Sequence, residues 1–307
     1  MKYIFVCNKN AGQRQATSLI KDQIQKLNNP IEYEIYETKA PLDATRFVLE
    51  YCDTHKDKET CFVACGGDGT INEVASALVN QKNKYLAVFA CGSGNDLIKY
   101  YKGKDFLSID KITNGTTKVI DILKVTDLTS NEVRYSINVC NIGLSAVVCA
   151  KANQLKDKGK TNAYNKALLH GIIHGMKNKI DIEADGKKIT NGELLICDLA
   201  NHQYVGGKYF SAPNALCDDG LIDLNLFLPV SLLKFAKCLP KYEKGLHNEF
   251  APKILGKENF IYEKIKKCHI YSDVKPFDVC IDGEMLKGSN YEVEIMPKSI
   301  NFIIPKD

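Results

Sequence analysis

The chain has 307 residues, of which 45% are hydrophobic and 25% charged, and it contains no low-complexity tract. This length exceeds what one hydrophobic core usually organises, so we expect two globular domains and exclude a fibrous or disordered protein. The formal net charge of +4 is too small to indicate a nucleic-acid partner.

No apolar run approaches the roughly 18 residues needed to span a bilayer, and no signal-peptide pattern follows Met1. The twelve cysteines lie mostly in apolar strand-like runs, and none forms a CxxC motif. Free cysteine behaves as a small buried hydrophobe, so reduced thiols are favoured over disulfides or a zinc site. We therefore expect a cytoplasmic protein.

The first hundred residues alternate between apolar strand-like runs and helix-like segments. Strands are predicted at Lys2–Asn8, Glu32–Glu37, Cys61–Cys65 and Tyr85–Cys91. Helices are predicted at Ala16–Leu27, Leu42–Tyr51, Ile71–Val79 and Asn95–Tyr101. Repeated βα units predict an α/β domain with a mostly parallel sheet, in which ligands bind at the carboxyl ends of the strands.

After Asp121 the pattern changes to short alternating segments separated by turn residues, which is typical of antiparallel sheet. The strand-like segments are Arg134–Asn141, Leu194–Leu199, Leu221–Phe227, His269–Tyr271, Asp278–Asp282 and Ser299–Pro305. Helices are predicted at Asn165–Met176 and Ser231–Tyr242. We expect an α/β domain at 1–121, joined by a returning segment near 290–307, and an antiparallel β-sandwich-like domain at 122–289.

The helix Asn165–Met176 carries two features of its own. Leu168, Leu169, Ile172 and Ile173 form an apolar stripe no wider than an ordinary buried face, which favours core packing over a lipid entrance or membrane contact. His170 and His174 have the i, i+4 spacing of a metal pair, but no third ligand is evident, which favours structural or solvent-facing histidines.

The segment Gly66-Gly67-Asp68-Gly69-Thr70 follows the third strand. Glycines let the backbone approach a ligand closely, and Thr70 with Glu73 reads as a capping box that opens a helix. Backbone N–H groups at such a helix start suit a phosphate chain, although a tight turn without a ligand is the alternative. No Walker-type Gly-x4-Gly-Lys-Ser/Thr motif occurs.

A second loop, Gly92-Ser93-Gly94-Asn95-Asp96, follows the next strand and should lie beside the first. Asp68 and Asp96 are candidate anchors for Mg²⁺, which prefers carboxylate oxygens and often binds through water. Asp121 is embedded in an apolar run, and a buried aspartate there must lie near a cation or be satisfied by backbone donors. Both alternatives remain open from the sequence.

These motifs resemble the diacylglycerol kinase catalytic-domain family, which includes bacterial diacylglycerol kinases, related soluble lipid kinases and sphingosine kinases. The resemblance extends over nearly the whole chain and is carried, in order, by Asn8–Gly12, Thr38, Gly66–Thr70, Gly92–Asp96, Asn214–Leu221 and Asp282–Glu284. The glycine pentapeptide alone is shared with NAD kinases, whereas the ordered set is more specific. The first motif lacks the proline that often follows its leading asparagine.

The resemblance implies a nucleotide-binding first domain and a lipid-binding second domain. It implies an ATP site lined by Asn8, Lys9, Asn10, Ala11, Gly12, Thr38, Gly66, Gly67, Asp68, Gly69, Thr70, Ile71, Asn72 and Ser93. It implies a catalytic Mg²⁺ held through water by Asp68, Asp96 and Asp121. It also implies a structural cation bound by the Asp219 side chain and by main-chain oxygens of Leu216 and Leu221.

Asp282 is the residue we expect to orient the attacking lipid hydroxyl and accept its proton, with Glu284 assisting at the phosphates or metal. The competing interpretation of Asp282-Gly283-Glu284 is an ordinary hairpin turn, since Asp-Gly is a favoured turn dipeptide. The segment Asn141–Val148 lacks the aspartate of sphingosine-specific relatives, which favours diacylglycerol or another lipid alcohol as the substrate.

The expected function is therefore an ATP- and Mg²⁺-dependent lipid kinase that converts diacylglycerol to phosphatidic acid at the membrane surface as a peripheral protein. A small-molecule kinase of the NAD kinase type and a non-catalytic lipid- or nucleotide-binding regulator are the alternatives. The lipid substrate is the expected partner, no nucleic acid is expected, and a homodimer is left open.

Overall fold

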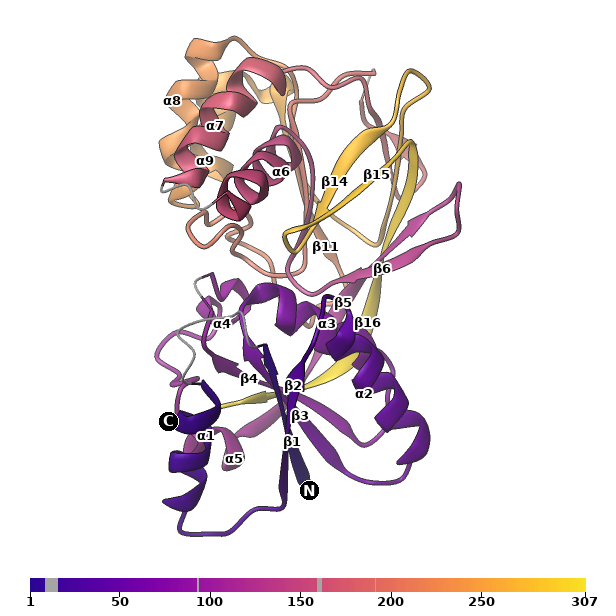
Figure 1. Ribbon diagram of the computed structural model, residues 1–307. Coiled ribbons are helices and arrows are strands. Elements are labelled where there is room, and N and C mark those ends of the chain that lie inside the picture. The colour runs from indigo at the N-terminus through magenta and orange to yellow at the C-terminus, as the bar shows by residue number, and fades with distance from the viewer. Residues whose placement is uncertain (9–15, 93, 159–161, 191) are drawn as a thin grey trace. The chain divides into compact units, whose positions relative to one another are not determined.

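The computed structural model describes residues 1–8, 16–92, 94–158, 162–190 and 192–307 (Figure 1). The chain forms two compact units, residues 1–122 with 297–307, and residues 123–296. The fold class predicted from the sequence is confirmed, because the first unit has a mostly parallel sheet with helices and the second has antiparallel sheets. In the part of the chain that the structure describes, no helix is long and apolar enough to cross a membrane.

The first unit is built on parallel strands in the order β2-β1-β3-β4, with the end of β16 beside β4. These strands are β1 (Lys2–Asn8), β2 (Tyr33–Thr38), β3 (Thr60–Gly66), β4 (Lys84–Ala90) and β16 (Asn290–Ile304). The helices are α1 (Ala16–Gln25), α2 (Asp43–Thr54), α3 (Asp68–Leu78), α4 (Asp96–Lys99) and α5 (Ile109–Thr113).

The continuous apolar runs of β1, β3 and β4 reflect burial on both faces, as parallel strands require. One face packs with α1 and α5, where Phe5, Val63 and Phe89 share a core with Ile20. The other face is covered by α2 and α3, and Phe62 there meets Tyr51 of α2 edge to face (Figure 1). Loops at the carboxyl ends of these strands are therefore held by a rigid layer.

The second unit contains a six-stranded antiparallel sheet in the order β12-β11-β10-β7-β14-β15. Its strands are β7 (Val139–Gly143), β10 (Ile196–Ala200), β11 (Ile222–Phe227), β12 (Phe260–Ile265), β14 (Phe277–Ile281) and β15 (Glu284–Gly288). The other strands of the unit belong to the ten-stranded sheet that also contains β1–β4. They are β5 (Thr116–Asp127), β6 (Val133–Ser136), β8 (Asp181–Ala184), β9 (Lys187–Lys188), β13 (Lys267–Tyr271) and part of β16. The segment predicted as one strand at Arg134–Asn141 is divided between β6 and β7.

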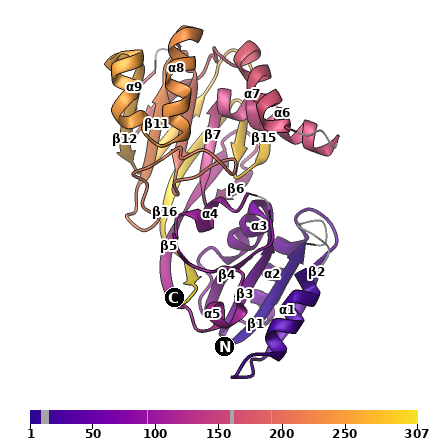
Figure 2. The same cartoon turned by 90° about the vertical axis from the view of Figure 1, so that its left-hand side faces the viewer.

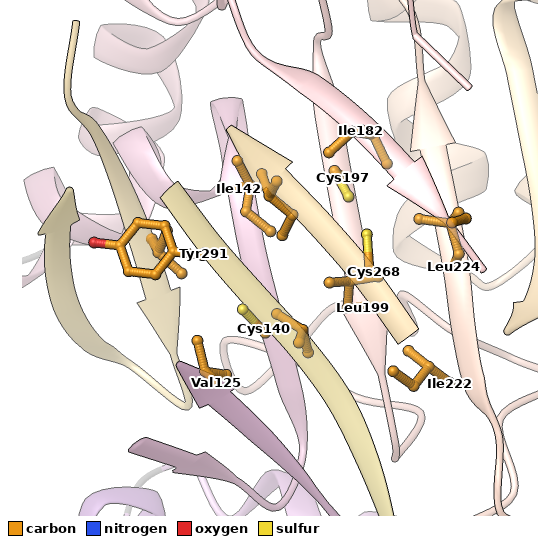
Figure 3. Packing of buried hydrophobic residues seen from close by; sticks show 14 of the residues in the cluster. Val125, Cys140, Ile142, Ile182, Cys197, Leu199, Ile222, Leu224, Cys268 and Tyr291 are labelled. Atoms are coloured by element: carbon orange, nitrogen blue, oxygen red, sulfur yellow. The ribbon is translucent and has the colours of Figure 1, made fainter. Parts of the chain in front are cut away.

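Buried side chains from both sheets of this unit form one apolar core (Figure 3). Cys140, Cys197 and Cys268 lie in this core among aliphatic side chains such as Ile182 and Leu224. All twelve cysteines of the chain are free thiols. The cysteines of this core therefore act as small apolar residues.

The opposite face of the six-stranded sheet is covered by helices (Figures 1 and 2). They are α6 (Leu144–Asp157), α7 (Ala163–His174), α8 (Leu232–Glu243), α9 (His247–Leu255) and the short 3₁₀ turn Lys257–Asn259. The expectation that the whole apolar stripe of α7 packs in the core is wrong. Leu168 and Ile172 are partly buried, whereas Leu169 and Ile173 are exposed.

Polar side chains are buried beneath these helices. Asp198 of β10 is inaccessible to solvent and accepts hydrogen bonds from Tyr242 (2.6 Å), Asn141 (2.7 Å) and Ser145 (3.2 Å). Burial raises the pKa of Asp198, and these hydrogen bonds oppose the shift. Beside Tyr242, with ring centroids 5.0 Å apart, lies the buried imidazole of His247.

His247 makes stability depend on pH, because burial lowers its pKa from 6.5 to about 4 while the nearby backbone of Ser211 opposes the shift. The folded state keeps the ring neutral, whereas the unfolded chain protonates it below 6.5. The free energy of unfolding should therefore fall as the pH drops from 6.5 towards 4, by up to about 3 kcal/mol from this residue.

Urea unfolding at pH 7 and pH 4.5 would measure this loss in wild type, His247→Phe and His174→Gln. The exposed His174 variant should keep the loss, and His247→Phe should lack most of it. Asp198 is present in all three proteins, so the comparison isolates His247. Equal pH dependence in wild type and His247→Phe would contradict the assignment.

Candidate functional site

The carboxyl ends of the parallel strands bring several predicted residues together in the first unit. Asn8 ends β1 and is the register partner of Thr38, which ends β2. The Asn8 amide donates to the Thr70 hydroxyl at 3.3 Å, and the Thr38 hydroxyl donates to the Cys7 carbonyl at 3.4 Å. Asn8, Thr38 and Thr70 therefore lie along one edge of the sheet, next to Gly66 at the end of β3.

The turns that follow β3 and β4 pack directly against each other. The Gly92 N–H donates to the Gly66 carbonyl at 3.1 Å. A Cβ on Gly92 would collide with the backbone of Gly67, and a Cβ on Gly94 would collide with the Asp68 carboxylate. Glycine is therefore required at position 92 by the close approach of the two turns, whereas a side chain at position 94 would displace the Asp68 carboxylate.

Helix α3 begins earlier than the sequence predicted, so the expected capping box at Thr70 is wrong. Gly67 is the N-cap, Asp68 is the first helical residue, and Thr70 lies inside the first turn. The Glu73 carboxylate accepts the Ala44 N–H of α2 at 3.1 Å instead of returning to its own helix start. The glycines allow the chain to turn directly into the helix, which places Asp68 at its positive end.

The three acids predicted to serve a metal are all held by hydrogen bonds. The Asp68 carboxylate accepts the Asp96 N–H at 2.6 Å, and Asp96 is buried with Lys99 at 2.7 Å from its carboxylate. Asp121 is inaccessible on β5 and accepts the Lys298 N–H at 2.7 Å. This backbone donor is one of the two alternatives that the sequence left open for Asp121.

The Asp68 carboxylate meets the backbone of Asp96, and the Asp96 carboxylate is paired with Lys99. Carboxylate oxygens of this kind can bind Mg²⁺ through water. Among the described residues, no three His, Cys, Asp or Glu side chains lie close enough to hold a metal ion directly. The predicted coordination was through water, so the metal roles of Asp68, Asp96 and Asp121 stay predictions.

Asp282 lies in the turn between β14 and β15 of the second unit, with a left-handed φ of 49°. One carboxylate oxygen accepts from the Ser136 hydroxyl at 2.9 Å and from the Asn138 and Val139 N–H groups at 3.0 Å each. The other oxygen accepts the Ile137 N–H at 2.7 Å. The segment is therefore a hairpin turn, and its aspartate is also fixed by four donors.

Helix α6 holds the same turn from another side. The Gly283 carbonyl accepts from the Asn153 amide at 2.8 Å and lies 3.7 Å from the Cys149 sulfur. The Cys149 sulfur is also 2.8 Å from the Cys280 sulfur of β14. Glu284, the first residue of β15, is exposed. The turn is thus anchored while Glu284 faces solvent.

A lysine binds the carboxylate of Asp219, which the resemblance assigns to a structural cation. Lys264 lies 2.7 Å from the Asp219 carboxylate and 2.9 Å from that of Asp223, and it reaches the Asn214 carbonyl at 3.5 Å. Burial alone would lower the pKa of Lys264, but its hydrogen bonds to both carboxylates raise it. Asp219 also accepts the Leu221 N–H at 3.1 Å. The Asp219 carboxylate therefore has an ammonium partner, and the structural-cation roles of Leu216, Asp219 and Leu221 stay predictions.

The remaining predicted residues differ in what they can contact. Ile71 is buried within α3, Asn72 accepts the Ser76 hydroxyl at 3.4 Å, and Leu216 is 45% exposed. Gly69 lies in the first turn of α3. The predicted positions that fall outside the described residues are Lys9, Asn10, Ala11, Gly12 and Ser93.

Sequence reasoning missed Lys99, Asn153 and Lys264. Lys99 had a readable signal, because its i, i+3 spacing from Asp96 places the two side chains on one helix face. Lys264 had none nearby, since it meets Asp223 only through the pairing of β11 with β12. Asn153 belongs to α6, a helix that was not predicted.

Two family models match the chain. Residues 2–125 match the diacylglycerol kinase catalytic domain, and residues 138–304 match the YegS C-terminal NAD kinase beta sandwich-like domain. Proteins named probable lipid kinase YegS-like from Enterobacter sp. (strain 638) and Klebsiella pneumoniae (strain 342) are 25% and 28% identical to it. Each comparison covers 96% of this chain, with 94% and 91% of the respective relatives.

The fold also matches a solved structure of a candidate diacylglycerol kinase from Bacillus anthracis (strain Sterne). The TM-score is 0.72 at 21% identity, covering 99% of this chain and 96% of the other. At this identity the match supports the fold alone.

The packing of the two glycine turns predicts unequal effects of alanine at neighbouring positions. Gly92→Ala should lower the free energy of unfolding by about 1–3 kcal/mol, because the new methyl group meets fixed backbone of Gly67. Gly67→Ala is the matched control, since its Cβ would lie an ordinary 3.5 Å from Gly92. Chemical denaturation measures both, and equal losses would contradict the close approach.

Lys264 should stabilise the Asp219 region in the way that a bound cation would. Lys264→Met should lower the melting temperature, because two carboxylates lose their shared ammonium, and added Ca²⁺ or Mg²⁺ should recover part of the loss. The melting temperature of the wild type should not change when EDTA is added. Lys253→Met, which breaks an exposed pair with Glu249, is the control. A wild-type protein destabilised by EDTA would overturn this assignment.

Proposed function

Because the chain belongs to the diacylglycerol kinase catalytic-domain family, with a carboxyl-terminal domain of the YegS type, we propose that it is a lipid kinase. The reaction transfers the γ-phosphoryl group of ATP to the hydroxyl of a lipid alcohol at a membrane surface. Diacylglycerol is the first candidate substrate, with phosphatidic acid as the product. The observation that carries the proposal is the pair of glycine turns that sets Asp68 against the backbone of Asp96.

The phosphates of ATP bind at the start of α3. Backbone N–H groups there have no partner within the helix, and the helix dipole favours an anion at this end. Gly66 and Gly67 keep side chains away from the approach. Asn8 and Thr38, at the ends of the neighbouring strands, are assigned to the same nucleotide site, as are Lys9–Gly12 and Ser93 by resemblance.

Asp68 and Asp96 hold Mg²⁺ through water in this proposal, with Asp121 as the third acid. The ion supplies charge neutralisation for the phosphoryl group in transfer. Lys99 adds a fixed positive charge beside Asp96. The role of the protein's own residues is to orient the phosphates and the ion before the alcohol arrives.

Asp282 orients the lipid hydroxyl and accepts its proton, and the exposed Glu284 assists. The four donors on Asp282 stabilise negative charge on its carboxylate and fix its direction. A carboxylate held in this way is better suited to positioning the alcohol than to removing its proton early. This role suits phosphoryl transfer through a loose transition state, because positioning and charge stabilisation account for most of its catalysis.

Activity with γ-labelled ATP tests the proposal directly. With Mg²⁺ and mixed micelles containing diacylglycerol, the label should enter the lipid phase as phosphatidic acid. A lipid extract analysed by mass spectrometry would identify another lipid alcohol if diacylglycerol is not the substrate. Label transferred to NAD, but to no lipid, would replace the proposal with a small-molecule kinase. If the protein binds ATP but transfers phosphate to no molecule in any extract, the result would favour a non-catalytic regulator.

Asp282→Asn should lower kcat/KM for the lipid by about a hundredfold or more, the usual contribution of a positioned acid–base group. The substitution also places an amide donor against the Ile137 N–H or its neighbours, so its stability must be measured. Ser136→Ala is the matched control, because it removes one donor and keeps the carboxylate. If folded Asp282→Asn phosphorylates lipid at an undiminished rate, the assigned role of Asp282 is wrong.

A further inference from the structure

Helix α7 leaves two of its four large aliphatic residues exposed, while Leu168 and Ile172 are partly buried. Its buried residues are the small ones, Ala163, Ala167 and Gly171. Its large apolar residues Leu169 and Ile173 are 62% and 67% exposed. A surface helix of a water-soluble protein ordinarily turns its large apolar residues towards the core.

The small residues let α7 lie close against α6, as both views of the fold show (Figures 1 and 2). A Cβ on Gly171 would collide with Val148 and Leu144 of α6. The helix is therefore fixed through its small face, and Leu169 and Ile173 cannot turn inward without displacing α6. Their exposure is a property of the packing.

The stretch of sequence that contains these two residues carries charge of one sign. Between Asp157 and Asp181 the sequence contains no Asp or Glu, but it contains five Lys and two His. The exposed cations among the described residues of this stretch include Lys158, Lys166 and Lys177. Lys166 lies three residues before Leu169 and seven before Ile173, which places all three on one helix face. Apolar and basic side chains thus share the outer surface of α7.

We propose that the outer face of α7 docks on an anionic phospholipid bilayer. Leu169 and Ile173 enter the boundary between headgroups and acyl chains, and the flanking lysines meet lipid phosphates, as in interfacial amphipathic helices. A second copy of this chain is the poorer occupant, because a symmetric contact would bring two basic surfaces together. The purpose of this docking rests on the proposed function, since the lipid substrate resides in the membrane.

Vesicle binding by the full chain tests the inference without catalysis. The protein is sedimented, without ATP, with vesicles of phosphatidylcholine alone and of phosphatidylcholine mixed with phosphatidylserine. Wild type should bind the anionic vesicles more tightly, and added salt should weaken binding. The double variant Leu169→Asn, Ile173→Asn should bind them about ten- to a hundredfold more weakly, because two apolar side chains no longer leave water.

The matched control is Leu19→Asn, Leu49→Asn, which alters leucines on α1 and α2 that are 43% and 42% exposed. It should bind as wild type does. Equal binding by wild type and the α7 variant, or no binding by wild type to either vesicle, would overturn the proposal. A dimer that the α7 variant abolishes, without vesicle binding, would assign the surface to a second copy.

A fluorescence measurement locates the contact, because the chain contains no tryptophan. Leu169→Trp should show a blue shift on anionic vesicles, and Leu49→Trp should not. Phosphorylation of a short-chain diacylglycerol dispersed in water should be unchanged in the α7 double variant. Vesicle binding by a protein that phosphorylates no lipid would remove the proposed function and leave the docking surface in place.

Discussion

The first unit depends on the contact between two glycine turns at the carboxyl ends of β3 and β4. Gly92 lies so close to Gly67 that a Cβ at position 92 would collide with the Gly67 backbone. This contact places the Asp68 carboxylate on the Asp96 backbone and starts α3 at Asp68. A single steric constraint therefore fixes the position of Asp68 relative to Asp96 and the position at which the amino-terminal end of α3 presents its backbone N–H groups.

The candidate acids share one structural device. Asp68, Asp121 and Asp282 each accept at least one backbone N–H, and the donors come from residues remote in sequence for all three. Backbone donors belong to the fixed frame of the fold, so they hold a carboxylate more firmly than a flexible side chain would. The geometry of these groups is thus set before any ligand binds, which is the condition for electrostatic preorganisation.

The regular βα half was predictable because β1, β3 and β4 are continuous apolar runs bounded by glycine, asparagine and turn residues. Strand β1 was predicted with both of its ends correct. Helix α6 was not predicted, since its first residues continue an apolar run that reads as strand. The start of α3 was predicted too late, because Thr70 and Glu73 have the spacing of a capping box. In the structure Gly67 is the N-cap, so the helix begins at Asp68 without that box.

Other features could not be foreseen because they depend on tertiary partners. On α7, Leu168 with Ile172 and Leu169 with Ile173 form adjacent stripes of equal hydrophobicity, and nothing local decides which pair faces inward. Gly171 determines which pair faces inward, because the absence of its side chain lets α6 pack against that side of α7. The candidate site shows the same division. The proximity of Asp68 and Asp96 could be predicted from the order of the strands, whereas the contact of Lys264 with Asp223 depends on the register of two antiparallel strands.

Strand β16 carries a consequence for how the chain acquires its fold during synthesis. Its residues Asn301 and Phe302 pair with Tyr85 and Leu86 of β4, so residues 297–307 complete the sheet of the first unit. The ribosome delivers them only after the whole second unit has been made. The amino-terminal sheet must wait, with one edge of β4 open, from the synthesis of Ala90 until residues 297–307 have been made. Premature termination near residue 296 would therefore damage the unit that was synthesised first.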